Sequence, residues 1–444
     1  MTEAQTQMNL PGVPRAKQGR EVPPKWEWTE ASVWTERMLE TLERGVKGGK
    51  WFSLIDKVWK RENLQSAITQ VVRNRGGAGV DGRSCEGYLK TAPERLPRLQ
   101  ELLRTGRYTP PPVKRVWIPK LGSKELRPLG IPTVEDRVVQ TAVRNVIEPI
   151  FENVFAEHSY GFRPGRGAKD ALRRVDQLLK AGRNWVVDAD LKGYFDSIPQ
   201  DKLLAAVAEH ISDGAVIELI EKMLRQGMME SGKGWQPTQT GTPQGAVVSP
   251  LLANIYLNPL DHLMAGGKRD MVRYADDFVV LCQSEEEARK VLEDLRQWVE
   301  AAGLTLHPTK TRIVDASQNG GFDFLGYHFE RGRRWPRQKS MDKFKETIRS
   351  KTGRLNPRPL GVIVKDVNRS LTGWFEYFKH SAGNVFSPLD GWVRGRIRAI
   401  LRRRHKLRGR ARGRDHQRWN NNYLASLGLI SLALARKRAS KAHS

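Results

Sequence analysis

The sequence predicts an α+β fold in which helices cover one face of an antiparallel sheet. Two apolar, strand-like segments, at 185–191 and 271–281, each carry aspartates. Other segments place apolar residues at three- and four-residue steps, a spacing typical of amphipathic helices. From residue 185 onward the predicted order is strand, helix, helix, hairpin, helix, strand and strand. This order suits a sheet backed by helices.

The first 106 residues predict short helices and a glycine-rich loop. Residues 1–45 are polar and contain prolines, so we expect a loose lead-in with a short helix near Ala31–Glu43. Apolar residues recur at helical spacing over 52–73. Four glycines within Gly76–Gly82 then exclude regular structure. This loop is either a flexible linker or a contact for a phosphate backbone, because arginines flank it.

Residues 107–135 are basic and strand-like, and two strands joined by a turn would bring Lys120 near Arg127. Such a cationic hairpin could clamp a triphosphate or could be a solvated surface, and charge patterning leaves both readings open. A helix is expected over 133–156. The basic loop Ser159–Gly167 then leads into a helix from Ala168, and a helix start of this kind suits an anion.

The aspartates of the strand-like segments suggest one shared cation site. Asp276 and Asp277 lie between two short apolar runs, which predicts a β-hairpin with both at its tip. An isolated Asp-Asp pair is more often a solvated turn, but Asp188 and Asp190 lie on a second strand. These two share a face, so only the one nearer the strand end need be a ligand. Carboxylate oxygens suit Mg²⁺, and two such ions can clamp the attacking and leaving oxygens of a nucleotidyl transfer.

The remaining elements follow from turn and cap signals. Gly241–Gly245 predicts a turn, and Ser249-Pro250 predicts the start of an apolar helix. Ser284–Glu287 is a capping box for a helix that stops at Gly303. Two strands are then expected, over Leu304–Leu306 and Phe322–Tyr327.

The charge is concentrated in the last quarter of the chain. Of the net charge of +27, residues 331–444 carry +24, from 30 Lys and Arg against 6 Asp and Glu. Residues 1–330 carry 46 against 43, a net of +3. A polyanionic partner is therefore expected for the C-terminal region. Its tryptophans and phenylalanines argue against a disordered basic tail, because such tails are poor in aromatic residues.

Cysteine content and hydropathy narrow the class further. With only Cys85 and Cys282, the sequence offers neither a disulfide framework nor a cysteine-based zinc site. No apolar run approaches the roughly 18 residues needed to span a bilayer, and the start lacks the apolar core of a signal peptide. We therefore expect a cytoplasmic protein, without a membrane partner, that acts on nucleic acid.

An ordered series of motifs resembles the group II intron-encoded reverse transcriptases and maturases, from about residue 60 to the C-terminus. The motifs are Gly79–Gly82, Ile118–Lys120, Arg127–Pro132, Tyr160–Pro164, Asp190–Asp196, Gln244-Gly245, Ser249-Pro250, Tyr274–Asp277, Phe324–Tyr327, Leu355–Pro357 and Gly373–Phe378. Many members of that family end in a Cys-rich endonuclease domain. Because no cysteine follows Cys282, we expect the form that lacks it.

The resemblance implies a right-hand polymerase with fingers and palm, then an all-α thumb and maturase domain, then a basic helical region. The implied segments are an extension over 1–59, a first fingers segment over 60–106, fingers and palm over 107–335, thumb and maturase over 336–385, and a DNA-binding region over 386–444. The expected activity is RNA-directed DNA synthesis, together with help in splicing and mobility of an intron. The implied partners are group II intron RNA, template RNA, primer DNA, target DNA and dNTPs.

The resemblance also assigns roles to single residues. Asp190, Asp276 and Asp277 would be the catalytic carboxylates and would bind two Mg²⁺ ions. Four residues would contact the incoming nucleotide: Lys120 and Arg127 at its triphosphate, Phe195 as a steric gate against a ribose 2′-hydroxyl, and Gln244 against the nascent base pair.

The resemblance also places Arg163 near the template, and the charge pattern predicts DNA contacts from the arginine-rich helix that contains Arg402, Arg403 and Arg404. Lys310 could donate a proton to pyrophosphate or be a plain surface lysine. Two other classes stay open, a reverse transcriptase for defence or DNA repair outside an intron, and a cofactor for splicing only. The acidic residues argue against the second, and Gly373–Phe378 favours the intron reading.

Overall fold

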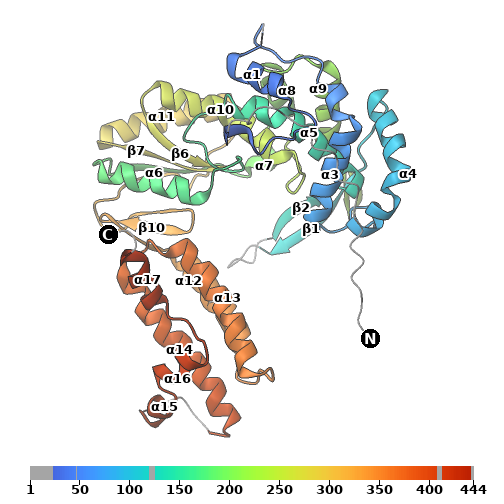
Figure 1. The fold of residues 1–444 in the computed structure, drawn as a ribbon. Coiled ribbons are helices and arrows are strands. Elements are labelled where there is room, and N and C mark those ends of the chain that lie inside the picture. The colour runs from blue at the N-terminus through green and yellow to red at the C-terminus, as the bar shows by residue number, and fades with distance from the viewer. Residues whose placement is uncertain (1–23, 47, 120–125, 408–412, 442–444) are drawn as a thin grey trace, which may run out of the picture.

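The computed structural model describes residues 24–46, 48–119, 126–407 and 413–441. They form a mixed body of helices and strands, followed by a helical C-terminal part (Figure 1). The predicted α+β class is confirmed. Within the described residues no helix combines the length and apolar character needed to cross a bilayer.

The N-terminal helices belong to the main hydrophobic core. They are α1 (Glu36–Arg44), α2 (Ile55–Val58), α3 (Arg61–Arg73), α4 (Cys85–Arg104) and α5 (Val134–Glu152). The short helix expected near Ala31–Glu43 is present as α1, but the loose lead-in expected around it is wrong from residue 24 onward, because Trp26 and Trp34 are 0% and 2% exposed within this core. The Trp34 indole also donates a hydrogen bond to the Asn145 carbonyl at 2.9 Å. The predicted loop at Gly76–Gly82 is confirmed.

A small sheet projects from this helical base. Its order is β2-β1-β4-β5, formed by β1 (Val113–Pro119), β2 (Leu126–Ile131), β4 (Met228–Glu230) and β5 (Gly234–Gln236). Strands β1 and β2 are antiparallel with Ile118 opposite Arg127, as predicted for the basic hairpin. Lys120 lies outside the described residues.

The central sheet carries the predicted aspartates. It has the order β6-β7-β3-β8, with every pair antiparallel, and comprises β3 (Trp185–Asp190), β6 (Asp270–Tyr274), β7 (Asp277–Cys282) and β8 (Arg312–Asp315). The β6–β7 hairpin is confirmed. Leu304–Leu306 is not a strand, since only Leu306 forms an isolated bridge, to Leu191. The strand after this segment is β8 instead.

Helices cover both faces of this sheet, not one face as expected. Val187, Phe278 and Val280 belong to the main core, which also contains buried residues of α10 (Ser249–Gly266) and α11 (Glu285–Ala301). A third sheet has the order β11-β10-β9 and comprises β9 (Phe322–Phe324), β10 (Tyr327–Glu330) and β11 (Arg333–Pro336). On the other face of the central sheet, Val186 and Val279 share a second core with α6 (Ala168–Lys180), β9 and β10. Strands β3 and β7 are apolar on both faces, so both faces must be covered.

Several predicted caps are confirmed. Helix α10 starts at Ser249 with proline in its first turn. The Ser284 hydroxyl accepts a hydrogen bond from the Glu287 amide at 3.2 Å at the start of α11. Between β3 and β6 lie three further helices, α7 (Tyr194–Ser197), α8 (Gln200–Ala208) and α9 (Gly214–Arg225).

The C-terminal part is a bundle with a core of its own. Its helices are α12 (Gln338–Lys351), α13 (Leu360–Phe378), α14 (Phe386–Arg404), α15 (Gly413–Arg418), α16 (Asn421–Ser426) and α17 (Leu432–Lys441). Phe375 of α13 and Phe386 of α14 have ring centroids 5.7 Å apart, and both belong to the same core as Leu432 of α17. The boundary expected at residue 385 therefore falls inside one hydrophobic core. The aromatic residues pack, as their presence predicted.

Candidate active site

Three aspartates meet at one end of the central sheet. Asp190 is the last residue of β3 and lies directly opposite Asp277, the first residue of β7, in the antiparallel register. Directly opposed residues of such a pair have Cβ atoms about 5 Å apart and on the same face. Asp276 immediately precedes Asp277, in the turn that joins β6 to β7. The predicted juxtaposition of the carboxylates is thus present in the fold.

The site concentrates negative charge in half-buried surroundings. Burial raises the pKa of the Asp277 carboxyl to about 7, and the nearby Asp188, Asp276 and Asp190 carboxylates contribute to this rise. Burial likewise raises the pKa of Asp276. Burial also lifts the pKa of Asp188 to about 6, although the Arg312 guanidinium opposes this. A cation placed among these groups would favour their ionised forms.

A lysine contacts one of these carboxylates. The Lys310 ammonium lies 2.5 Å from Asp190 Oδ2, although the lysine side chain is 59% exposed. The predicted surface lysine therefore reaches into the site. Within the described ranges no three His, Cys, Asp or Glu side chains are already gathered at metal-binding distance. The side chains available as metal ligands are nevertheless all carboxylates, which are ligands that Mg²⁺ prefers, and one of them already attracts the Lys310 ammonium.

Two predicted nucleotide contacts are linked to each other. Arg127 of β2 donates through Nε to Gln244 Oε1 at 2.8 Å, and Gln244 Nε2 donates to Asp196 Oδ2 at 3.2 Å. This chain of hydrogen bonds joins the projecting sheet, the Gly241–Gly245 turn and the start of the helical segment after β3. The spacing of the sequence alone did not indicate that Asp196 would be the third member.

Phe195 lies five residues after Asp190 in α7. It is 8% exposed, and its ring packs edge-on to Tyr194 with centroids 5.6 Å apart. Its carbonyl accepts a hydrogen bond from the Thr242 amide at 2.7 Å, so the turn that carries Gln244 is tied to Phe195. A Cβ at Gly241, where φ is +78°, would lie 2.5 Å from that carbonyl, which explains the glycine.

Arg163 is buried, contrary to its expected contact with a template. Its side chain is 2% exposed and forms a two-pronged ion pair with Glu152, with Nε–Oε2 at 2.9 Å and Nη2–Oε1 at 2.7 Å. Nη1 also donates to the Ser159 carbonyl at 2.8 Å. These internal contacts leave no surface for a nucleic acid. Arg163 instead fixes the basic loop against the end of α5.

The arginines at the end of α14 divide into two kinds. Arg402 is 14% exposed and pairs with Asp415 of α15, so it holds the bundle together. Arg403 and Arg404 are exposed. Arg403 lines an open depression together with Arg354 and Leu355, whose side chain is 76% exposed. The sequence did not indicate this depression, because it joins the α12–α13 connection to the end of α14.

Comparison with known proteins places the two parts in two family models. The model described as "Reverse transcriptase (RNA-dependent DNA polymerase)" matches residues 118–329. The model described as "Group II intron, maturase-specific domain" matches residues 341–419. The first match covers the central sheet and the small projecting sheet except residues 113–117 of β1. The second covers helices of the C-terminal bundle on both sides of residue 385.

Curated relatives agree with these matches. Group II intron-encoded protein LtrA of Lactococcus lactis subsp. cremoris is 40% identical over 199 residues, which are 44% of this chain and 32% of that protein. Protein YkfC of Escherichia coli (strain K12) is 35% identical over 321 residues, or 63% of this chain and 83% of that protein. An uncharacterized 91 kDa protein in the cob intron of Schizosaccharomyces pombe is 31% identical over 280 residues, 50% of this chain and 34% of its own length. The chain thus matches about a third of the length of LtrA.

Proposed function

Because this chain belongs to the family of group II intron-encoded reverse transcriptases and maturases, we propose that it is an RNA-directed DNA polymerase that also assists the splicing and mobility of an intron RNA. The observation that carries the polymerase assignment is the register of Asp190 opposite Asp277, next to Asp276 in the turn. The match at 341–419 supports the role in splicing. Its substrates would be dNTPs, template RNA and a DNA primer.

The three aspartates would hold two Mg²⁺ ions. When bound, such ions lower the pKa of a primer 3′-hydroxyl and neutralise charge that develops on the α-phosphate and the pyrophosphate. The contribution of the protein is to bring Asp190 at the end of β3 together with Asp276 and Asp277 at the β6–β7 turn. Lys310, at 2.5 Å from Asp190, supplies a proton-bearing cation at the same place.

Other residues would select and hold the nucleotide. Arg127 would contact the triphosphate. Its hydrogen bond to Gln244, which in turn bonds Asp196 of α7, fixes the orientation of the Arg127 and Gln244 side chains. Phe195 is largely buried, with its backbone tied to the Gly241–Gly245 turn, so it offers a fixed wall against a 2′-hydroxyl. The exposed arginines of α14 and of the α12–α13 connection would bind phosphates of intron RNA and target DNA.

The proposal is tested by primer extension with the full chain, an RNA template, a DNA primer, dNTPs and Mg²⁺. Asp276→Ala should lower cDNA synthesis at least about a hundredfold, because metal-bound charge stabilises the transition state by several kcal/mol. Asp201→Ala is the matched control, since the Asp201 side chain is 92% exposed on α8. RNA binding should be unchanged in both variants. Near-normal dNTP incorporation by Asp276→Ala would sink the assignment.

A further inference from the structure

A fully buried arginine lies directly behind the turn that carries Asp276. Arg273 of β6 is 0% exposed and forms a two-pronged ion pair with Asp261 of α10, with Nε–Oδ1 at 2.7 Å. Its Nη1 donates to Asn254 Oδ1 at 2.9 Å and to the Ala275 carbonyl at 2.8 Å. The cation therefore joins α10 to the backbone of the turn, one residue before Asp276.

The turn has a backbone that needs such support. Ala275 has φ of +60°, in the left-handed region that side-chain-bearing residues seldom adopt. The chain at Gly161 presses against it, since a Cβ there would lie 2.2 Å from the Ala275 nitrogen. Asn254 Nδ2 donates to the Gly161 carbonyl at 2.8 Å. Asn254 thus holds both the neighbouring loop and the arginine that holds the turn.

Stability alone is a weak reason for this arrangement. Burial of two charges costs hydration free energy, and this cost offsets much of their mutual attraction. Well-packed apolar residues in their place often stabilise a fold equally well or better. Arg273 and Asp261 are 0% and 3% exposed, so this loss applies to both. Arg273 also donates to the Ala275 carbonyl in the turn that carries Asp276. This contact indicates that the pair fixes the backbone geometry of that turn.

We propose that Asp261, Arg273 and Asn254 form a positioning network that sets where the carboxylates of Asp276 and Asp277 lie. The network contacts no substrate, and it acts through the backbone of residues 274–277. This inference rests on the proposed function for the identity of the reaction. It adds that the affinity of the turn for Mg²⁺ depends on residues of α10 that do not contact the ion.

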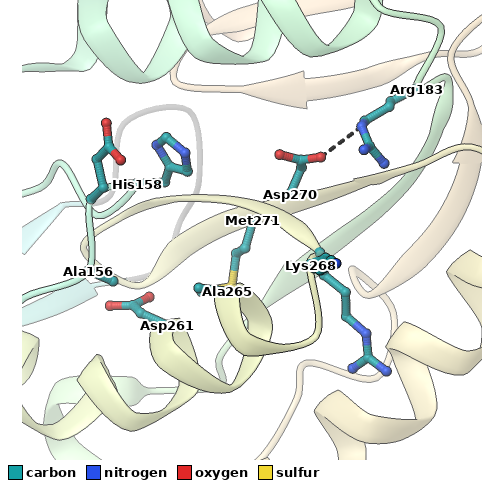
Figure 2. A pocket seen from close by; sticks show the side chains of 10 residues that line it. Ala156, His158, Arg183, Asp261, Ala265, Lys268, Asp270 and Met271 are labelled. Carbon is teal, nitrogen blue, oxygen red and sulfur yellow. Dashed lines mark ion pairs between the residues drawn. The ribbon is translucent and has the colours of Figure 1, made fainter.

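The far end of β6 is held by separate contacts. Asp270 pairs with Arg183 and Arg174 at 2.7 Å each. Figure 2 shows the pair with Arg183 at a pocket of about 370 Å³, which Asp261 and Met271 also line. The strand is therefore anchored independently of the turn. Loss of the network should loosen the turn without releasing the strand.

Two asparagines of α10 provide a matched test. Asn254 belongs to the network. Asn258, one helical turn later, accepts from the Ala156 amide at 3.2 Å and makes no hydrogen bond to the turn among the described residues. Asn254→Ala should raise the Mg²⁺ concentration for half-maximal primer extension by up to about tenfold. This is the low end of the range for loss of a direct partner of a metal ligand, because Asn254 acts one step further out, through Arg273. Asn258→Ala should leave it unchanged.

A second readout does not depend on activity. Mg²⁺ should raise the melting temperature of the nucleic-acid-free wild type and of Asn258→Ala, and should raise that of Asn254→Ala much less. If Asn254→Ala does not fold, Asn254→Leu is measured in its place, because a side chain of similar volume fills the space but offers Arg273 no hydrogen-bond acceptor. Equal Mg²⁺ responses in the two asparagine variants would show that the network is only structural. A wild type that binds Mg²⁺ but extends no primer would overturn the proposed function and leave the network standing.

Discussion

Basic residues are used differently in the body and in the C-terminal bundle. In the body, where the net charge is +3 over residues 1–330, Arg273 and Arg163 are buried and each is matched by one carboxylate. In residues 331–444, with 30 basic against 6 acidic residues, most cations cannot find an acidic partner. Arg403 and Arg404 accordingly reach solvent. Buried arginines thus fix backbone geometry in the body, whereas the exposed arginines of the bundle would be available to a polyanion under the proposed function.

The largest difference should appear in stability. Arg163→Ala removes one partner of a buried ion pair and leaves Glu152 without its cation, so it should lower the free energy of unfolding by about 3–5 kcal/mol. Arg403→Ala should change it by no more than about 0.5 kcal/mol, because the side chain is exposed. Urea unfolding followed by circular dichroism measures both. Equal losses in the two variants would remove the distinction.

The two parts should also respond to pH in opposite ways. Burial raises the pKa of Asp136, in α5 of the body, from 3.8 to about 7. The folded state therefore holds a proton that the unfolded state has lost, and stability falls as pH rises through 7. Each such proton gives a slope of about 1.4 kcal/mol per pH unit, or about 2 kcal/mol between pH 5.5 and 7. In the bundle, hydrogen bonding to Arg358 lowers the pKa of Asp366. The contribution of Asp366 to stability is therefore present at neutral pH and is lost only when pH falls into the acidic range.

Comparison of Asp136→Asn with the wild type tests this sign. The variant should lose less unfolding free energy than the wild type between pH 5.5 and 7.5, because an amide has no proton to release. Asp366→Asn is the control and should not alter the slope in that window. An unchanged slope in Asp136→Asn would mean that the buried carboxyl is already ionised at pH 5.5.

Substrate choice should depend on the body alone. Phe195→Ala should raise the ratio of kcat/KM for ribonucleotides to that for deoxyribonucleotides by about tenfold, or about 1.4 kcal/mol, because it opens space beside the 2′ position. Affinity for DNA should not change. Arg403→Ala with Arg404→Ala should leave the ratio unaltered. A ratio that stays constant in Phe195→Ala would make this residue part of the core only.

The smallest effect concerns the salt dependence of DNA binding. Replacing both Arg403 and Arg404 by alanine should reduce the slope of log affinity against log salt by about 1 to 2 units, since each phosphate that is no longer neutralised removes about 0.9. Polymerisation on a saturating short primer–template should be spared. Arg402→Ala is the informative contrast, since removal of its pair with Asp415 should lower stability more than the slope. Parallel salt titrations for wild type and double variant would exclude a role for these two arginines in DNA binding.

Local patterns predicted that the aspartates share a site. The apolar strand at 185–190 and the short β6–β7 turn are short-range features, and the aspartates on both predicted one shared site. The register that pairs Asp190 with Asp277 joins segments far apart in the sequence and was not predicted. Caps such as Ser284 are equally local. The fold class and the basic hairpin rested on the same kind of signal. These parts of the structure could therefore be predicted from the sequence.

Side-chain contacts between separate elements could not be predicted from the sequence. Arg273 and Asp261 are twelve residues apart on a strand and a helix, and their pairing depends on how α10 packs against β6. The family resemblance placed Arg163 near the template, but its ion pair with Glu152 at the end of α5 holds it inside the fold. Trp26 was placed in a loose lead-in and Trp34 in a short helix within it, yet both are buried in the main core. In each case tertiary packing decided the outcome.

The burial of both cysteines has a practical consequence. Cys85 is 6% exposed and Cys282 is 0% exposed, and burial raises the pKa of the Cys282 thiol to about 12. Thiol reagents act on accessible thiolates, so the native chain gives them almost no target. A fluorophore pair attached through Lys233→Cys, beside β5, and Ser387→Cys, in α14, would therefore label two chosen points without removal of a native cysteine. The separation between the projecting sheet and the bundle could then be followed in solution while a template is bound and copied.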